Sequence, residues 1–127
     1  MQRIGKIAPL HSTGVGKCLL LDYSEPQIVQ LVAKGLTALT KNTITTGGDL
    51  LTELAKVRKQ GYSEDKEECE IGVRCVAAPV RDYSGKVVAA ISTSGPTHRL
   101  TADKLKLIRT ELPAVAAAIS KRLGFDL

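Results

Sequence analysis

Hydrophobic residues recur every three or four positions in four parts of the chain, which is the spacing of amphipathic helices. The first predicted helix covers residues 11–23, with Ser12 or Thr13 as its N-terminal cap. The second opens with Ser24–Gln27, a capping box with proline in the first turn, and stops at Gly35. We therefore expect two consecutive helices with a short connection between them.

The third and fourth predicted helices are longer. The third follows the cap sequence Thr46–Asp49 and ends at Gly61, whereas the fourth is capped by Thr101 and ends at Gly124. Pro113 lies inside the fourth helix, where it predicts a kink or a split. The apolar residues of this helix form one continuous face, made of Leu105, Ile108, Leu112, Val115, Ile119 and Leu123.

Between the third and fourth helices the pattern becomes that of β-strands. Residues 62–67 predict a short polar strand. Residues 74–81 and 86–94 are β-rich runs joined by the turn sequence Asp82–Gly85, so they predict a hairpin that Gly95-Pro96 ends. The predicted fold class is therefore α/β (α+β), a mainly antiparallel sheet flanked by helices.

The length and composition indicate a single globular domain with an aliphatic core. The chain has 127 residues, of which 43% are hydrophobic but only 3% aromatic, with no Trp. It shows no signal peptide and no apolar run long enough to span a membrane. Three cysteines, an odd number, fit a reduced compartment. We expect a cytoplasmic protein with no membrane contact.

The net charge of +5 does not by itself indicate a nucleic-acid interface. Basic residues alternate with acidic ones, as in Lys66-Glu67-Glu68 and Asp103-Lys104, and no basic run is interleaved with aromatic residues. These positions predict a mildly basic, solvated surface and no direct binding of DNA.

The beginning of the chain suggests that the domain is incomplete. Met1–Lys6 has the pattern of a strand end that is entered in mid-domain. Three strands also make a small sheet for a chain of 127 residues. We expect further strands of the same domain to precede Met1.

The segment Thr13–Lys17 carries glycines and a lysine, like a phosphate-binding loop, but it does not match that motif. His11 stands where the motif needs its first glycine, and Cys18 where it needs Ser or Thr. The dinucleotide fingerprint also fails, because Leu19 occupies its third glycine position. No nucleotide or other cofactor is expected.

Gly14 and Gly16 leave two interpretations open. Glycines at the start of a helix expose backbone N–H groups, which together with the helix dipole suit a small anion such as a carboxylate. Alternatively, the two glycines only allow the helix to pack closely on the sheet. This segment alone does not distinguish an anion site from close packing.

The hairpin brings polar side chains onto one face of the sheet. If Arg81 pairs with Lys86 across the turn, Cys75 lies directly opposite Ser92, and Ser94 points to the same face. A slip of one residue would send the cysteine and the serines to opposite faces. The predicted cluster of one thiol and two hydroxyls therefore depends on the turn.

That face also carries the small residues Ala77 and Ala90, so it is either packed tightly by a helix or leaves room for a ligand. A catalytic alternative has Cys75 as a nucleophile, which needs a base. The candidates are His11 and His98, and His98 follows the second hairpin strand at a distance. The expectation is a protein without enzymatic activity and without catalytic residues.

The acidic segment around Glu67–Glu70 predicts a solvated surface, from which only Asp65 reaches the hairpin face. A zinc site using Cys69, Cys75, Asp65 or a histidine is a further alternative, but the gap between the two cysteines does not match the usual short ligand spacings. No metal ligands are therefore predicted.

Taken in order, several segments resemble the effector-binding domain of the IclR (isocitrate lyase regulator) family of bacterial transcription regulators. The resemblance spans nearly the whole chain with suitable spacing, and it is strongest at Gly72–Val80. The matching segments are Pro9–Lys17, Asn42–Thr45, Gly61–Glu68, Gly72–Val80, Ala89–Pro96 and Arg99–Thr101.

The resemblance implies a GAF-like fold that binds a small organic acid, such as a carboxylate or sugar acid. In the family a separate N-terminal winged helix-turn-helix binds DNA, and the regulators are dimers or tetramers. Residues 1–127 would then be an effector-binding domain that lacks the DNA-binding part and the first strands of its own domain. By similarity, the ligand-binding residues are Gly14 and Val15 through their amides, together with Asp65, Cys75, Ser92 and Ser94.

The sequence is thus interpreted as the small-molecule-sensing domain of a DNA-binding transcription regulator such as a repressor. Its partners would be a small carboxylate effector and further copies of the chain, with DNA bound only through the missing N-terminal domain. Two alternatives remain open: a dimerisation module without a ligand, and an enzyme that depends on Cys75.

Overall fold

The structure, a computed structural model, describes residues 9–126. The expectation of a strand end at Met1–Lys6 lies outside these residues. The elements are α1 (Gly14–Leu19), the 3₁₀ helix η1 (Leu20–Asp22), α2 (Glu25–Ala33), α3 (Gly47–Gln60), β1 (Ser63–Lys66), β2 (Val73–Arg81), β3 (Val87–Pro96) and α4 (Ala102–Arg122). This order agrees with the predicted one.

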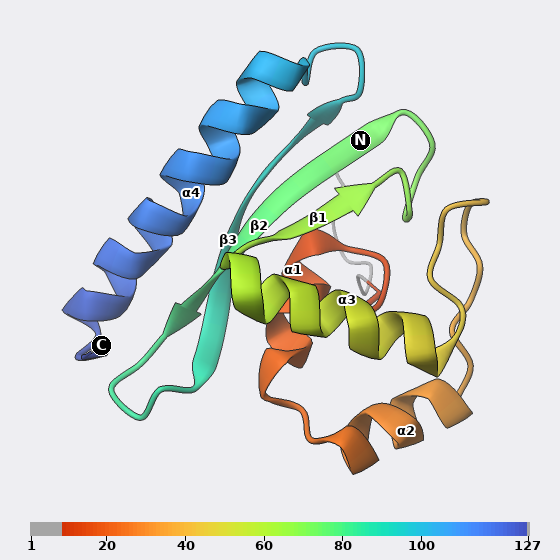
Figure 1. Ribbon diagram of the computed structural model, residues 1–127, viewed down its shortest axis with the longest axis horizontal. Coiled ribbons are helices and arrows are strands. Elements are labelled where there is room, and N and C mark those ends of the chain that lie inside the picture. Colours follow the sequence, from red (N-terminus) through yellow and green to blue (C-terminus); the bar gives the residue numbers. More distant parts are fainter. Residues whose placement is uncertain (1–8, 127) are drawn as a thin grey trace.

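The elements form an antiparallel sheet with helices on both faces, so the predicted α+β architecture is confirmed. The strand order is β1-β2-β3. Figure 1 shows α4 running along one face of the sheet, with α1 and α3 on the other side. α1 contacts both β2 and β3, while α2 packs against α3 and does not cover the sheet directly.

The predicted caps are largely confirmed. Thr13, not Ser12, caps α1, because its hydroxyl oxygen accepts the Gly16 N–H at 3.0 Å. Ser24 and Gln27 form both hydrogen bonds of the capping box that begins α2. At the end of α3, Gly61 adopts the left-handed conformation at φ 86°, which favours glycine.

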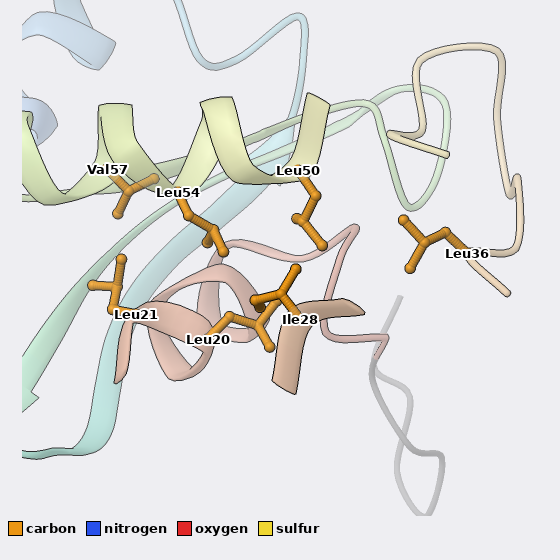
Figure 2. Packing of buried hydrophobic residues seen from close by; sticks show 7 residues of the cluster. All are labelled: Leu20, Leu21, Ile28, Leu36, Leu50, Leu54 and Val57. Carbon is orange, nitrogen blue, oxygen red and sulfur yellow. The ribbon is translucent and has the colours of Figure 1, made fainter. Parts of the chain in front are cut away.

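The core is aliphatic, as the composition predicts. Figure 2 shows side chains of α3 pointing toward those of η1 and α2. Burial of each such side chain contributes roughly 1.5–3 kcal/mol. The buried members of this cluster are Leu20, Leu21, Ile28, Leu36, Leu50, Leu54 and Val57. A second, smaller cluster joins Ala78 and Val80 of β2 to Ala116 of α4.

The predicted contact face of α4 is correct only in its first half. Leu105 is buried and Leu112 packs against the sheet cluster, but Val115, Ile119 and Leu123 are 50%, 36% and 45% exposed. Beyond Leu112 the buried stripe continues in steps of four residues, through Ala116 and Ser120. The pattern of large apolar residues does not reveal this stripe, because the stripe consists of an alanine and a serine.

α4 is one uninterrupted helix, so the split considered at Pro113 is wrong. Ser120 ties the end of this helix to the sheet. Its hydroxyl oxygen accepts the Arg81 N–H at 2.9 Å and donates to the Ala116 carbonyl at 2.8 Å. Near the other end, Arg109 donates two hydrogen bonds to Glu64 Oε1 of β1.

The predicted register of the hairpin is wrong by two residues. Arg81 pairs with Val87, not Lys86, and Val80 pairs with Ala89, so a bulge leaves Val88 as an extra residue in β3. Lys86 instead closes the turn, where its carbonyl accepts the Asp82 N–H. One extra turn residue and one bulged residue together make a shift of two.

An even shift keeps every side chain on its predicted face. Cys75 therefore lies opposite Ser94, and Ala77 lies opposite Ser92, instead of the predicted pairing of Cys75 with Ser92. The thiol and both hydroxyls still share one face. Strand β1 pairs with the other edge of β2, and there Asp65 is the direct partner of Cys75, so its side chain points to the same face.

Candidate functional site

A cavity of about 530 Å³ lies between α1 and the sheet, within the range typical of small-molecule sites. All six residues singled out from the sequence line it. The lining residues are Thr13, Gly14, Val15, Asp65, Cys69, Glu70, Val73, Cys75, Ser92, Ser94, Gly95 and Pro96. The structure thus brings together positions that are up to 80 residues apart in the chain.

The α1 wall of the cavity comes from the first turn of the helix. First-turn N–H groups have no acceptor within their own helix. The Gly16 N–H is satisfied by the Thr13 side chain and the Lys17 N–H by the Thr13 carbonyl. Gly14 and Val15 carry the two remaining first-turn amides, and both residues line the cavity.

Both glycines also have a packing role, but only Gly14 packs on the sheet as the second interpretation holds, whereas Gly16 packs on the segment that precedes α1. A Cβ atom on Gly14 would lie 3.1 Å from Ala77 Cβ and from Cys75 Sγ. A Cβ atom on Gly16 would lie 2.6 Å from the Leu10 backbone, a distance that real Cβ atoms do not adopt. Close packing and exposed amides therefore coexist in α1.

The sheet wall is centred on Cys75, which is 9% exposed. Burial raises the pKa of its thiol above the usual value, although hydrogen bonds from Ser94, Ser92 and the Gly14 backbone oppose the shift. The thiol is therefore protonated at neutral pH, whereas a reactive cysteine needs a thiolate. These contacts place both serines and the α1 wall around the sulfur atom.

Neither described histidine lines this cavity. His11 is buried, and its Nε2 lies 2.9 Å from the Thr37 carbonyl oxygen, while His98 is exposed. Among residues 9–126, no group of three or more His, Cys, Asp and Glu side chains is arranged to hold a metal ion. Among the described residues, neither histidine is therefore placed to act as a base on Cys75, whose surroundings are the hydroxyls of Ser92 and Ser94 and the carboxyl group of Asp65.

Asp65 closes the cavity at the end of β1 and is 5% exposed. Its Oδ1 accepts the N–H groups of Glu68 at 2.7 Å and Cys69 at 3.4 Å. Burial raises the pKa of this carboxyl group, and the two backbone hydrogen bonds act against that rise. Asp65 therefore shapes the loop that follows β1 while it faces the cavity.

The segment after β1 is not the solvated acidic surface that the sequence predicted. Glu68 is buried, and Cys69 and Glu70 line the cavity, although the sequence pointed to Cys69 only as a zinc ligand and to Glu70 only as part of a solvated surface. The sequence signal for Cys69 and Glu70 would have been their position four and five residues after Asp65. An Asp side chain often bonds to the backbone of the residues that follow it, which keeps those residues close to the Asp.

The family described as "Bacterial transcriptional regulator IclR C-terminal" matches residues 1–121. The HTH-type transcriptional repressor AllR of Salmonella typhi is 39% identical over 121 residues, which cover 91% of this chain and 44% of AllR. The chain thus spans less than half the length of this relative.

Solved structures agree. The Agobacterium tumefaciens repressor BlcR superposes with a TM-score of 0.89 at 33% identity, over 98% of this chain and 51% of BlcR. A double mutant of the inducer-binding domain of the Acinetobacter transcription factor PobR, solved as a complex with 3-hydroxybenzoic acid, has a TM-score of 0.81 at 30% identity. That match covers 96% of this chain and 69% of the PobR chain.

None of the helices in residues 9–126 has both the length and the apolar character needed to cross a lipid bilayer. The match to the family covers nearly the whole chain, and the fold agrees with that of solved members at more than 30% identity. This chain therefore belongs to the IclR family of bacterial transcriptional regulators, as its C-terminal effector-binding domain.

Proposed function

We propose that this domain senses a small organic acid, which binds in the cavity between α1 and the sheet. The observation that carries the proposal is the convergence of all six sequence-predicted residues on one cavity of suitable size. The domain would be part of a DNA-binding regulator such as a repressor, and it would have no enzymatic activity of its own.

The cavity offers complementary groups to such an acid. The amides of Gly14 and Val15 suit the carboxylate, because neither has an acceptor within its helix, and the Gly14 amide would be shared between the ligand and the Cys75 thiol. The hydroxyls of Ser92 and Ser94 and the thiol of Cys75 suit the other polar atoms of the ligand. The PobR complex with 3-hydroxybenzoic acid supports an acid as the class of ligand.

Ligand binding would control DNA binding by the full-length regulator. DNA would be bound by an N-terminal winged helix-turn-helix in the part of the regulator that this chain does not span, and the regulator would be a dimer or tetramer. Such control requires the ligand to bind one conformation or assembly more tightly than the other.

A thermal-shift screen tests the proposal with glyoxylate, pyruvate, lactate, 2-keto-3-deoxygluconate and aromatic acids. A ligand at a hundred times its Kd stabilises the folded state by about 2.7 kcal/mol, which raises the Tm of a domain of this size by several degrees. We expect one class of acid to raise the Tm, and Ser92→Ala to abolish the shift.

Thr93→Ala is the matched control, because Thr93 lies on the same strand but points to the opposite face. It should keep the shift. If no acid raises the Tm of a folded sample, the sensor proposal is wrong and the domain is an assembly module. The exposed apolar residues Val115, Ile119 and Leu123 of α4 favour that second function.

A further inference from the structure

Lys17 is the residue of the Thr13–Lys17 segment that the proposed ligand contacts leave unexplained. Its side chain is completely buried, and its ammonium group lies among three acceptors. The hydrogen-bond distances from Nζ are 2.6 Å to Glu53 Oε2, 2.8 Å to the Glu64 carbonyl oxygen and 3.0 Å to Glu68 Oε2. A buried ammonium group is tolerated only with such pairing.

Two of these acceptors lie on either side of Asp65 in the sequence: the Glu64 carbonyl belongs to β1, and the Glu68 carboxylate belongs to the loop that follows β1. The Glu68 carboxylate also accepts the Lys66 N–H at 3.0 Å. Asp65 Oδ1 in turn accepts the Glu68 and Cys69 N–H groups. The loop is thus folded around two carboxylates, of which one is held by the lysine.

The lysine itself belongs to the opposite wall. It follows Gly14 by three residues in α1, so the lysine contacts fix the helix turn whose amides face the cavity. We infer that Lys17 is a positioning residue that sets the separation between the α1 wall and the Asp65 loop, and so the ligand affinity of the cavity. This inference rests on the proposed function.

The loop has a second anchor that does not involve Lys17. The Thr40 hydroxyl donates to the Glu67 carbonyl at 2.6 Å, and the Thr43 hydroxyl donates to the Glu68 carbonyl. Replacement of the lysine therefore leaves the loop attached on its outer side. The expected result is a loosened cavity wall in a folded domain.

The test measures the alkylation of the three cysteines by iodoacetamide, without any ligand, in the variant Lys17→Met. Cys69 and Cys75 line the cavity, whereas Cys18 is completely buried beside Ser63 and is not a lining residue. Mass spectrometry of the peptides gives one rate for each thiol. We expect Cys75 to react about tenfold faster than in the wild type through local opening, with the Cys18 rate unchanged.

Glu68→Gln is the second variant, which keeps the size of the side chain and removes its charge. It should also raise the alkylation rate of Cys75 and leave that of Cys18 unchanged, but the increase should be smaller. If Lys17→Met does not fold, this variant tests whether the contact between Lys17 and Glu68 positions the cavity walls. Lys56→Met is the matched control, because Lys56 is an exposed lysine of α3; it should leave all three rates unchanged.

Two results would overturn the inference. Equal acceleration of Cys18 and Cys75 means global unfolding, and an unchanged Cys75 rate in both folded variants means that Lys17 does not position the walls. In the thermal screen, any acid that shifts the wild type should lose its shift in Lys17→Met but keep it in Lys56→Met. Absence of a shift in the wild type would disprove the sensor function, while the alkylation rates still decide the role of Lys17.

Discussion

The two helices that cover the sheet, α1 and α4, approach it in different ways. α1 has six residues and comes close through Gly14, whose missing side chain leaves backbone amides near the sheet and a cavity beside them. α4 has 21 residues and packs on the other face through Ala116, with Ser120 bonded to a strand. One sheet can therefore carry a tightly packed face under α4 and, under α1, a face that leaves room for a ligand.

Among the variants that test this difference between α1 and α4, Gly16→Ala should change the free energy of unfolding most. Alanine normally stabilises a helix relative to glycine by about 1 kcal/mol. Here the new Cβ would lie 2.6 Å from the Leu10 backbone, so the change should destabilise the domain by about 3 kcal/mol, the upper end for overpacking. Urea unfolding measures the difference.

Gly48→Ala is the control for that prediction, because nothing lies within 4 Å of a Cβ built on Gly48 in α3. It should stabilise the domain by roughly 0.4–1 kcal/mol through the unfolded chain. If Gly16→Ala were as stable as Gly48→Ala, the close approach of α1 to Leu10 would not exist in solution.

Ser120→Ala tests the attachment of α4 and should have an intermediate effect. It leaves the partly buried Arg81 N–H without its acceptor, and an unsatisfied buried donor costs about 1–3 kcal/mol. Thr110→Ala is matched to it, because Thr110 also donates to the carbonyl four residues back but is exposed. The control should change the free energy of unfolding by less than about 0.5 kcal/mol, and equal effects would contradict a specific anchor.

Asp65→Asn should have the smallest effect, visible in the pH dependence of stability. Burial raises the pKa of Asp65 in the folded state, so the folded protein holds this proton more tightly than the unfolded chain does. The contribution of this proton to stability is complete below the unfolded pKa and is lost as the pH rises through the folded pKa.

Asparagine keeps the Oδ1 acceptor for the Glu68 and Cys69 amides but does not titrate. The usual pKa of an aspartate in an unfolded chain is about 3.9. As the pH rises above that value, the difference in unfolding free energy between the wild type and Asp65→Asn should therefore shift in favour of the variant. A constant difference between about pH 3 and pH 7, or the opposite trend, would show that the carboxyl pKa is not raised.

Much of the fold was accessible from the sequence, because local signals determine it. Caps at Thr13, Ser24, Thr46 and Thr101 begin the four α-helices, as predicted. The buried residues of α4 beyond Leu112 could not be predicted from hydrophobicity. Ala116 is buried because it packs against β2, and Ser120 accepts a hydrogen bond from the Arg81 N–H of the same strand.

The candidate site could be predicted from the sequence in part. The glycines at the start of α1, the pairing of the hairpin and the family resemblance pointed to six positions, and all six line one cavity. Their role as ligand contacts stays a prediction. Lys17 and Glu68 were missed, because the sequence shows a lysine and an acidic segment that look solvated when considered separately. Only the fold shows that they meet in the interior, 51 residues apart.

The bulge in the hairpin also bears on how this domain tolerates changes of length during evolution. One residue more in the turn, Lys86, is matched by one more in β3, Val88, so the face of Cys75 and Ser94 is preserved. A single insertion or deletion that no bulge compensates would turn the cavity residues of β3 toward the opposite face, while a paired one would not. The expected constraint on the length of this hairpin is therefore one of parity, because only even changes keep Ser92 and Ser94 on the cavity face.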